Sequence, residues 1–139
     1  HGSLMHLAGN MLYLWIFGDN IEDALGHLRY LAFYVTTGLI ASLAHVVTNA
    51  TGASAEIPSL GASGAISGVL GGYMLLHPRR SVHVLILRVV TTVPAIVAIG
   101  LWFVFQVIEG LGAFGSATGG GVAYAAHFGG FIAGLALVK

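Results

Sequence analysis

The sequence predicts an all-α fold, a polytopic bundle of membrane-spanning helices. Hydrophobic residues occupy 57% of the 139 positions and charged residues only 7%, and the mean hydropathy is +0.91. Because soluble domains carry about 25% charged residues, this chain has too few charges to coat a water-exposed globule. The chain also lacks the alternating pattern of a membrane barrel, so helices are the expected way to satisfy the backbone in lipid.

Five apolar segments mark the expected helices of one domain that covers residues 1–139. A spanning helix needs about 20 residues. The first and third segments are short, so we expect them to borrow flanking residues or to start below the membrane surface. In chain order, the segments are Leu4–Phe17, Tyr30–Val47, Ser63–Leu76, Val82–Ile108 and Gly121–Val138.

The basic residues predict how these segments are oriented. Lys and Arg gather at the first connector, the third connector and the C-terminus, whereas the connectors Thr48–Leu60 and Glu109–Gly120 have none. The positive-inside rule therefore predicts a cytoplasmic C-terminus and places the two uncharged connectors outside. The glycine-rich connector before Gly121 is either a plain flexible loop or a mobile cap over a site. The basic residues are Arg29, Arg79, Arg80, Arg88 and Lys139.

Stripes of small residues run along the third and the last segments. Glycines recur every four residues in the third segment, and small residues do the same in the last. Such stripes let helix backbones approach closely in lipid. We therefore expect these two helices to touch, which would bring short side chains at their outer ends within reach of each other. The stripes are Gly64, Gly68 and Gly72 in the third segment, and Ala126, Gly130 and Gly134 in the last.

Four polar side chains interrupt apolar segments at a similar predicted depth. Ser63 begins the third segment, His127 follows the start of the last segment by six residues, and His6 and Asn10 lie four residues apart in the first. The predicted topology places all four in the outer half of the bilayer. Polar and ionisable groups at such depth are costly and usually functional.

The chemistry of these groups predicts a serine hydrolase. Ser63 is the expected nucleophile and His127 the base that takes its proton and returns it to the leaving group. We expect no carboxylate nearby, so packing and a hydroxyl such as that of Ser67 would orient His127. Donors from His6 and Asn10, together with the Ser63 backbone N–H, are expected to form an oxyanion hole, the set of donors that stabilises a tetrahedral oxyanion.

Simpler roles are open for each residue taken alone. Ser63 could cap the N-terminus of its helix, His127 could bond a backbone carbonyl, and His6 and Asn10 could link helices. The sequence has no cysteine, which excludes disulfides and thiol catalysis, and its formal net charge of +0 argues against binding to nucleic acid. We expect no cofactor and no metal.

Three motifs in order resemble the rhomboid intramembrane serine proteases over nearly the whole chain. They are His1-x4-His6-x3-Asn10, then Gly61-Ala62-Ser63-Gly64, and finally Ala126-His127-x2-Gly130-x3-Gly134. The connector Glu22-x3-Gly26-x2-Arg29-Tyr30 is also similar to that of the family.

The resemblance implies a six-helix core, of which the first helix and a long outer loop would precede His1. It implies cleavage of single-span membrane proteins near their outer end, with Ser63 and His127 as a dyad and with His6, Asn10 and the Ser63 N–H as the oxyanion hole. His1, Gly61, Gly64, Gly130 and Gly134 are expected to support the site. Some relatives carry an aromatic residue one turn after the serine, and here that position is Ser67.

Three other functions compete with this one. An inactive relative that only binds transmembrane proteins would usually lack the serine or the histidine, and both are present. A metal enzyme could use the nitrogens of His1, His6 and His127, but no HExxH motif is present. A transporter would often show repeated halves and midplane charges, and neither is visible.

Overall fold

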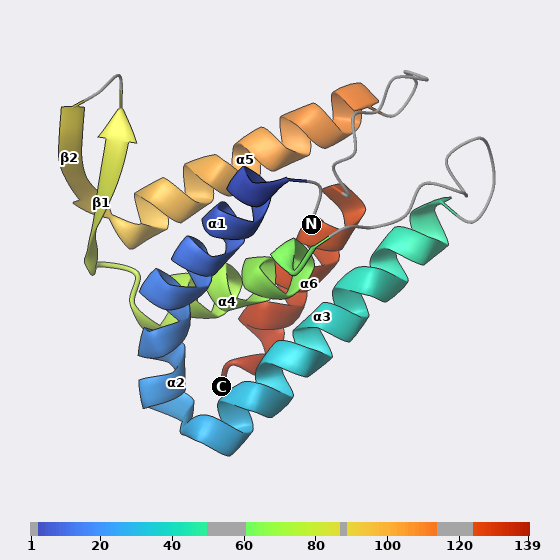
Figure 1. Ribbon diagram of the computed structural model, residues 1–139, viewed down its shortest axis with the longest axis horizontal. Helices are drawn as coiled ribbons and strands as arrows, with labels where there is room; N and C mark the ends of the chain where they lie inside the picture. The colour runs from blue at the N-terminus through green and yellow to red at the C-terminus, as the bar shows by residue number, and fades with distance from the viewer. Residues whose placement is uncertain (1–2, 50–60, 87–88, 114–123) are drawn as a thin grey trace.

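The computed structural model describes residues 3–49, 61–86, 89–113 and 124–139, which form a mostly helical bundle (Figure 1). The chain begins with one helical run that comprises α1, a π-helical turn and α2. Ser3 caps this run, because its side chain accepts a hydrogen bond from the His6 backbone N–H. The run is longer than the expected first segment, and its parts are α1 (Leu4–Tyr13), η1 (Leu14–Gly18) and α2 (Asp19–Leu25).

A glycine turn sends the chain back into the longest helix. Gly26 has a φ of 79°, a left-handed conformation that costs little without a Cβ, and it ends α2 immediately before α3 (His27–Asn49). Helix α3 runs along one side of the bundle (Figure 1). This turn lies within the connector that was expected between the first two spans.

Helices α4 (Ser63–Leu76) and α6 (Tyr124–Leu137) form the centre of the bundle. Every residue of α4 from Gly64 to Tyr73 is buried, which explains why this segment is apolar on all sides. The core also includes aromatic side chains from η1, α3 and α6, which are Phe17, Phe33 and Phe131.

The predicted contact between the glycine stripes is present. A Cβ added at Gly130 would collide with the Gly64 carbonyl oxygen, and one added at Gly134 would collide with that of Gly68. A Cβ at Gly68 itself would lie within 2.5 Å of Thr37 on α3. The α4 glycines therefore pack closely against α3 on one side of the helix. On another side, their carbonyl groups contact the glycines of α6.

The expected fourth segment, Val82–Ile108, is not one helix. Its first part forms an antiparallel hairpin of β1 (Ser81–Ile86) and β2 (Val89–Pro94), paired from Ser81↔Pro94 to Ile86↔Val89, and α5 (Ala95–Ala113) follows. The reason is local. β-branched residues dominate 82–93 and favour strands, and Pro94 lacks the N–H that a helix interior requires. Hydropathy alone could not separate this apolar hairpin from the helix after it.

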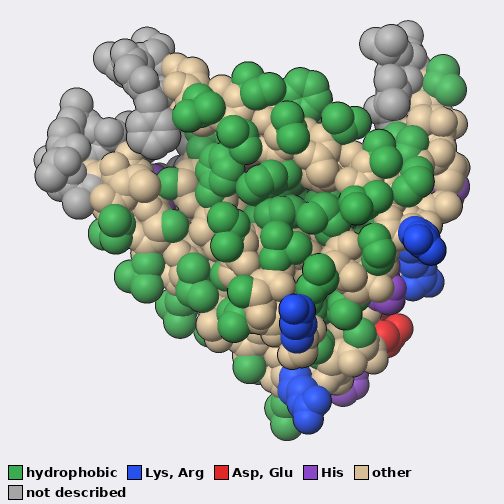
Figure 2. Space-filling model, turned by 180° about the vertical axis from the view of Figure 1, so that it is seen from behind, with side chains coloured by type: hydrophobic (Ala, Val, Ile, Leu, Met, Phe, Trp, Pro, Cys, Tyr) green, Lys and Arg blue, Asp and Glu red, His purple; other side chains and the backbone are tan. Residues whose placement is uncertain are grey.

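Within the described ranges, two helices are long and apolar enough to cross a membrane, His27–Asn49 and the α5 stretch Ala95–Gly112, and α4 and α6 are shorter apolar helices. Large apolar side chains point outward, among them Trp15 at 76% and Phe105 at 61% exposure. Figure 2 shows apolar side chains over much of one face, with Lys and Arg side chains confined to its lower half. A lipid-facing surface with charges at one end explains this distribution.

Candidate active site

The turn before α4 places Ser63 at the first position of the helix. Gly61 has a φ of 101°, which a residue with a Cβ rarely adopts, and Ala62 then occupies the N-cap position. Ala62 gives the helix no side-chain cap. The hydroxyl of Ser63 is therefore not the N-cap that the simpler role required, and the N–H groups of the first α4 turn lack helical acceptors.

The hydroxyl of Ser63 meets the imidazole of His127 on α6. Its Oγ lies 2.9 Å from His127 Nε2, within hydrogen-bonding distance. The two residues are 64 positions apart in the chain, so helix packing alone creates this contact. The glycine contacts of Gly130 and Gly134 with α4 hold the two backbones close enough for a side chain as short as serine to reach the ring.

A side chain from α5 holds the other nitrogen of the His127 ring. Gln106 Oε1 lies 2.6 Å from Nδ1. One turn earlier, the Trp102 ring lies beside the imidazole, with ring centroids 6.0 Å apart, and it also contacts Phe131. Sequence reasoning missed Gln106, although an amide within the apolar run 101–108 was a visible signal.

Ser67 does not occupy the position that was expected of it. It is buried, and its hydroxyl donates to the Ser63 carbonyl oxygen over 2.8 Å. The hydroxyl of Ser67 is therefore bonded to the backbone of the first α4 turn, and the group at His127 Nδ1 is the amide of Gln106 instead. Ser67 does not reach His127 because a serine inside a helix readily donates its hydroxyl hydrogen to the carbonyl oxygen four residues earlier, here that of Ser63.

Helix α1 brings two polar residues to the same end of the bundle. His6 is close enough to His127 for the two imidazoles to interact electrostatically. Asn10 is buried at 7% exposure, and its side-chain Nδ2 donates to the His6 carbonyl oxygen over 2.7 Å. This bond uses one of the two amide hydrogens of Asn10. His1 lies outside the described residues.

Glu109 lies one turn beyond Gln106 on α5, and its side-chain hydrogen-bond partner is Tyr124 on α6 rather than His127. Its Oε2 accepts a hydrogen bond of 3.4 Å from the Tyr124 hydroxyl. The nearest acidic side chain along α5 therefore does not serve as the partner of His127. In the part of the chain that the structure describes, no group of three or more His, Cys, Asp or Glu residues could hold a metal ion.

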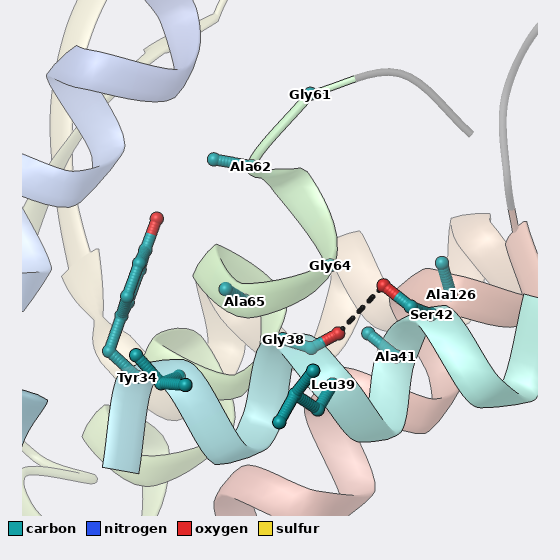
Figure 3. A pocket seen from close by; sticks show the side chains of 11 residues that line it. Tyr34, Gly38, Leu39, Ala41, Ser42, Gly61, Ala62, Gly64, Ala65 and Ala126 are labelled. Atoms are coloured by element: carbon teal, nitrogen blue, oxygen red, sulfur yellow. Dashed lines mark hydrogen bonds between the residues drawn. The ribbon is translucent and has the colours of Figure 1, made fainter. Parts of the chain in front are cut away.

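A pocket of about 300 Å³ opens beside the Ser63 turn, between α3 and α4 (Figure 3). Its walls include the residues that flank Ser63 and the one that precedes His127. Most of the lining is small or apolar, and the Ser42 hydroxyl is bonded to the Gly38 carbonyl oxygen within it. The lining includes Tyr34, Gly38, Ala41, Ser42, Gly61, Ala62, Gly64, Ala65 and Ala126.

Comparisons with known proteins show which family the chain resembles. The family model described as the Rhomboid domain matches residues 1–139. The chain is 36% identical over 137 residues to "Rhomboid protein 1, mitochondrial" of Saccharomyces cerevisiae, covering 97% of this chain and 37% of that protein. It is 38% identical over 129 residues to "Rhomboid protease GluP" of Bacillus subtilis, covering 91% and 24%.

A third relative is the mouse "Presenilin-associated rhomboid-like protein, mitochondrial", 39% identical over 92 residues, which covers 66% of this chain and 24% of that protein. The chain thus spans between 24% and 37% of the length of these relatives. No solved structure gives a significant match. Because the family match covers residues 1–139, the chain belongs to the rhomboid family.

Proposed function

We propose that this chain is the core of an intramembrane serine endopeptidase that cleaves single-span membrane proteins near the outer membrane face. The observation that carries the proposal is the 2.9 Å contact between Ser63 Oγ and His127 Nε2 inside an apolar bundle. A serine hydroxyl is a weak nucleophile unless an adjacent base takes its proton. This contact provides such a base at the required distance.

The reaction is acyl transfer to Ser63 followed by hydrolysis. His127 Nε2 accepts the Ser63 proton while Oγ attacks the scissile carbonyl carbon, and the carbonyl oxygen becomes an oxyanion. His127 then gives the proton to the leaving nitrogen as the C–N bond breaks. A water molecule attacks the acyl-enzyme, His127 takes its proton, and the carboxyl product leaves as the proton returns to Ser63.

The start of α4 is suited to stabilise the oxyanion. Helix N-termini carry N–H groups without helical acceptors and a partial positive charge, and α4 has no side-chain cap that would compete for them. The Ser63 N–H, with donors from His6 and Asn10 on α1, would surround the developing charge. The Asn10 amide has two Nδ2 hydrogens, and one of them bonds the His6 carbonyl oxygen. The second hydrogen would donate to the substrate.

The length of α4 supports a site below the membrane surface. Its 14 residues extend about 21 Å at 1.5 Å per residue, which is less than the roughly 30 Å of the hydrocarbon core. With Arg79 and Arg80 after α4 at the cytoplasmic boundary, Ser63 would lie within the outer half of the bilayer. The substrates are then transmembrane segments that unwind near their outer end, and no cofactor or metal is needed.

The test is cleavage of a model single-span substrate in liposomes. Ser63→Ala and His127→Ala are each expected to abolish cleavage and labelling by a fluorophosphonate probe, while the thermal unfolding of the bundle stays near that of the wild type. Cleavage at the wild-type rate by either variant would refute the proposal. Binding of the substrate by the wild type without any cleavage would instead favour the inactive rhomboid-like alternative.

A further inference from the structure

We propose that Gln106 is a positioning residue that fixes the protonation pattern of His127, taking the place that a carboxylate holds in a serine–histidine–aspartate triad. The inference rests on the proposed function, because it assigns Gln106 a role in the same reaction. It stands on the 2.6 Å contact between Gln106 Oε1 and His127 Nδ1. No sequence motif pointed to this residue.

The contact determines which nitrogen of the ring carries the proton. An amide oxygen only accepts hydrogen bonds, so Nδ1 must be the protonated nitrogen of a neutral His127. Nε2 then has a free lone pair, directed at the Ser63 hydroxyl 2.9 Å away. This is the tautomer that can take the Ser63 proton. In the opposite tautomer, Nε2 would carry a hydrogen and could not act as the base.

Three neighbouring side chains have another hydrogen-bond partner or lack an acceptor for Nδ1–H. Ser67 donates to the Ser63 carbonyl, and Glu109 accepts from Tyr124. Trp102 packs a ring beside the imidazole but offers only an indole N–H, which is a donor. Among the residues that contact the ring from α5, Gln106 is therefore the one with an acceptor for Nδ1–H.

A neutral acceptor for His127 Nδ1–H is also better suited than a carboxylate to a site within the membrane. An ionised carboxylate on an apolar membrane helix carries a desolvation cost that an amide does not. The Gln106 side chain is half-buried, so the amide sits between the exposed side of α5 and the dyad. The chain thus supports the imidazole with one amide hydrogen bond and one aromatic contact, both from consecutive turns of α5.

The experiment compares Gln106→Met with Gln106→Glu in the full chain reconstituted in liposomes. Methionine matches the length of glutamine without a strong acceptor, whereas glutamate keeps an acceptor oxygen at the same place. We expect Gln106→Met to lower kcat about 10- to 100-fold with KM nearly unchanged, since one hydrogen bond is lost from a barrier-determining group. Gln106→Glu should recover most of that loss. Val107→Met, a half-buried change on the same turn, is the matched control and should keep the wild-type kcat.

A second measurement does not depend on any variant that alters α5. In the wild type with ¹⁵N-labelled histidine, the resonances that disappear in His127→Ala report its tautomer at neutral pH. An Nδ1 of the protonated type with an Nε2 of the unprotonated type is expected, and the reverse pattern would overturn the inference.

The two proposals can fail separately. If Ser63→Ala cleaved the substrate at the wild-type rate, the proposed function itself would be refuted. If Ser63→Ala is inactive but Gln106→Met keeps the wild-type kcat, or if Gln106→Glu loses as much activity as Gln106→Met, only the role of Gln106 is refuted. A loss in Val107→Met equal to that in Gln106→Met would likewise refute it, because general damage to α5 would then explain both.

Discussion

Replacing Gly130 with alanine tests whether glycine contact is what brings the dyad together. Gly130 lies on α6, three residues after His127, and its Cα faces the backbone of α4 at Gly64. A Cβ there would collide with the Gly64 carbonyl oxygen and would lie 2.9 Å from the carbonyl carbon. Both obstacles are backbone atoms of a buried helix, so no side chain can rotate to relieve the collision.

The size of the effect follows from these distances. Ordinary contacts of a Cβ begin at 3.4 Å. To reach an ordinary contact, the Gly64 carbonyl carbon must therefore move about 0.5 Å away from the new Cβ, and the carbonyl oxygen must move farther. The Ser63–His127 contact, 2.9 Å long, lies at the same interface and would stretch past the usual limit of a hydrogen bond. A displacement of about 1 Å at a reacting group can cost on the order of 10²-fold in rate, and overpacking typically costs about 1–3 kcal/mol of stability.

The assay is kcat for a transmembrane substrate together with the unfolding temperature in detergent. We expect Gly130→Ala to lower kcat about 10²-fold and to lower the unfolding temperature. Gly100→Ala on α5 is the control, because nothing lies within 4 Å of a Cβ added there, and it should be neutral or slightly stabilising. Wild-type activity and stability in Gly130→Ala would refute the argument that this contact positions the dyad.

Two further changes test the groups around the dyad. Asn10→Ala should lower kcat on the order of 10²-fold without abolishing it, because one oxyanion donor is lost and others remain; an unchanged kcat would exclude Asn10 from the oxyanion hole. Trp102→Leu should lower kcat about 2- to 10-fold because the ring beside His127 contributes an aromatic contact. Trp102→Phe, which keeps a ring, should lose less in the same assay, and equal losses would show that the ring contact is not what matters.

Much of the fold followed from local pattern. Low charge and high hydropathy predicted a membrane helix bundle, and the four-residue spacing of Gly64, Gly68, Gly130 and Gly134 predicted the close approach of α4 and α6. The hairpin between α4 and α5 was missed because apolar strands and apolar helices give the same hydropathy signal. Its β-branched residues and Pro94 were the cues that distinguished them.

Apolar runs, glycine spacing and the placement of Ser63 and His127 are local properties of the chain, so they could predict which helices touch and which residues are candidates for the chemistry. The group that holds the imidazole could be identified only from the packing of the helices. The partner of Nδ1 is Gln106, 21 residues before His127 on another helix, and Ser67 is instead bonded to its own helix. A hydrogen-bond partner depends on how α5 lies against α6, and no spacing along either segment encodes that angle.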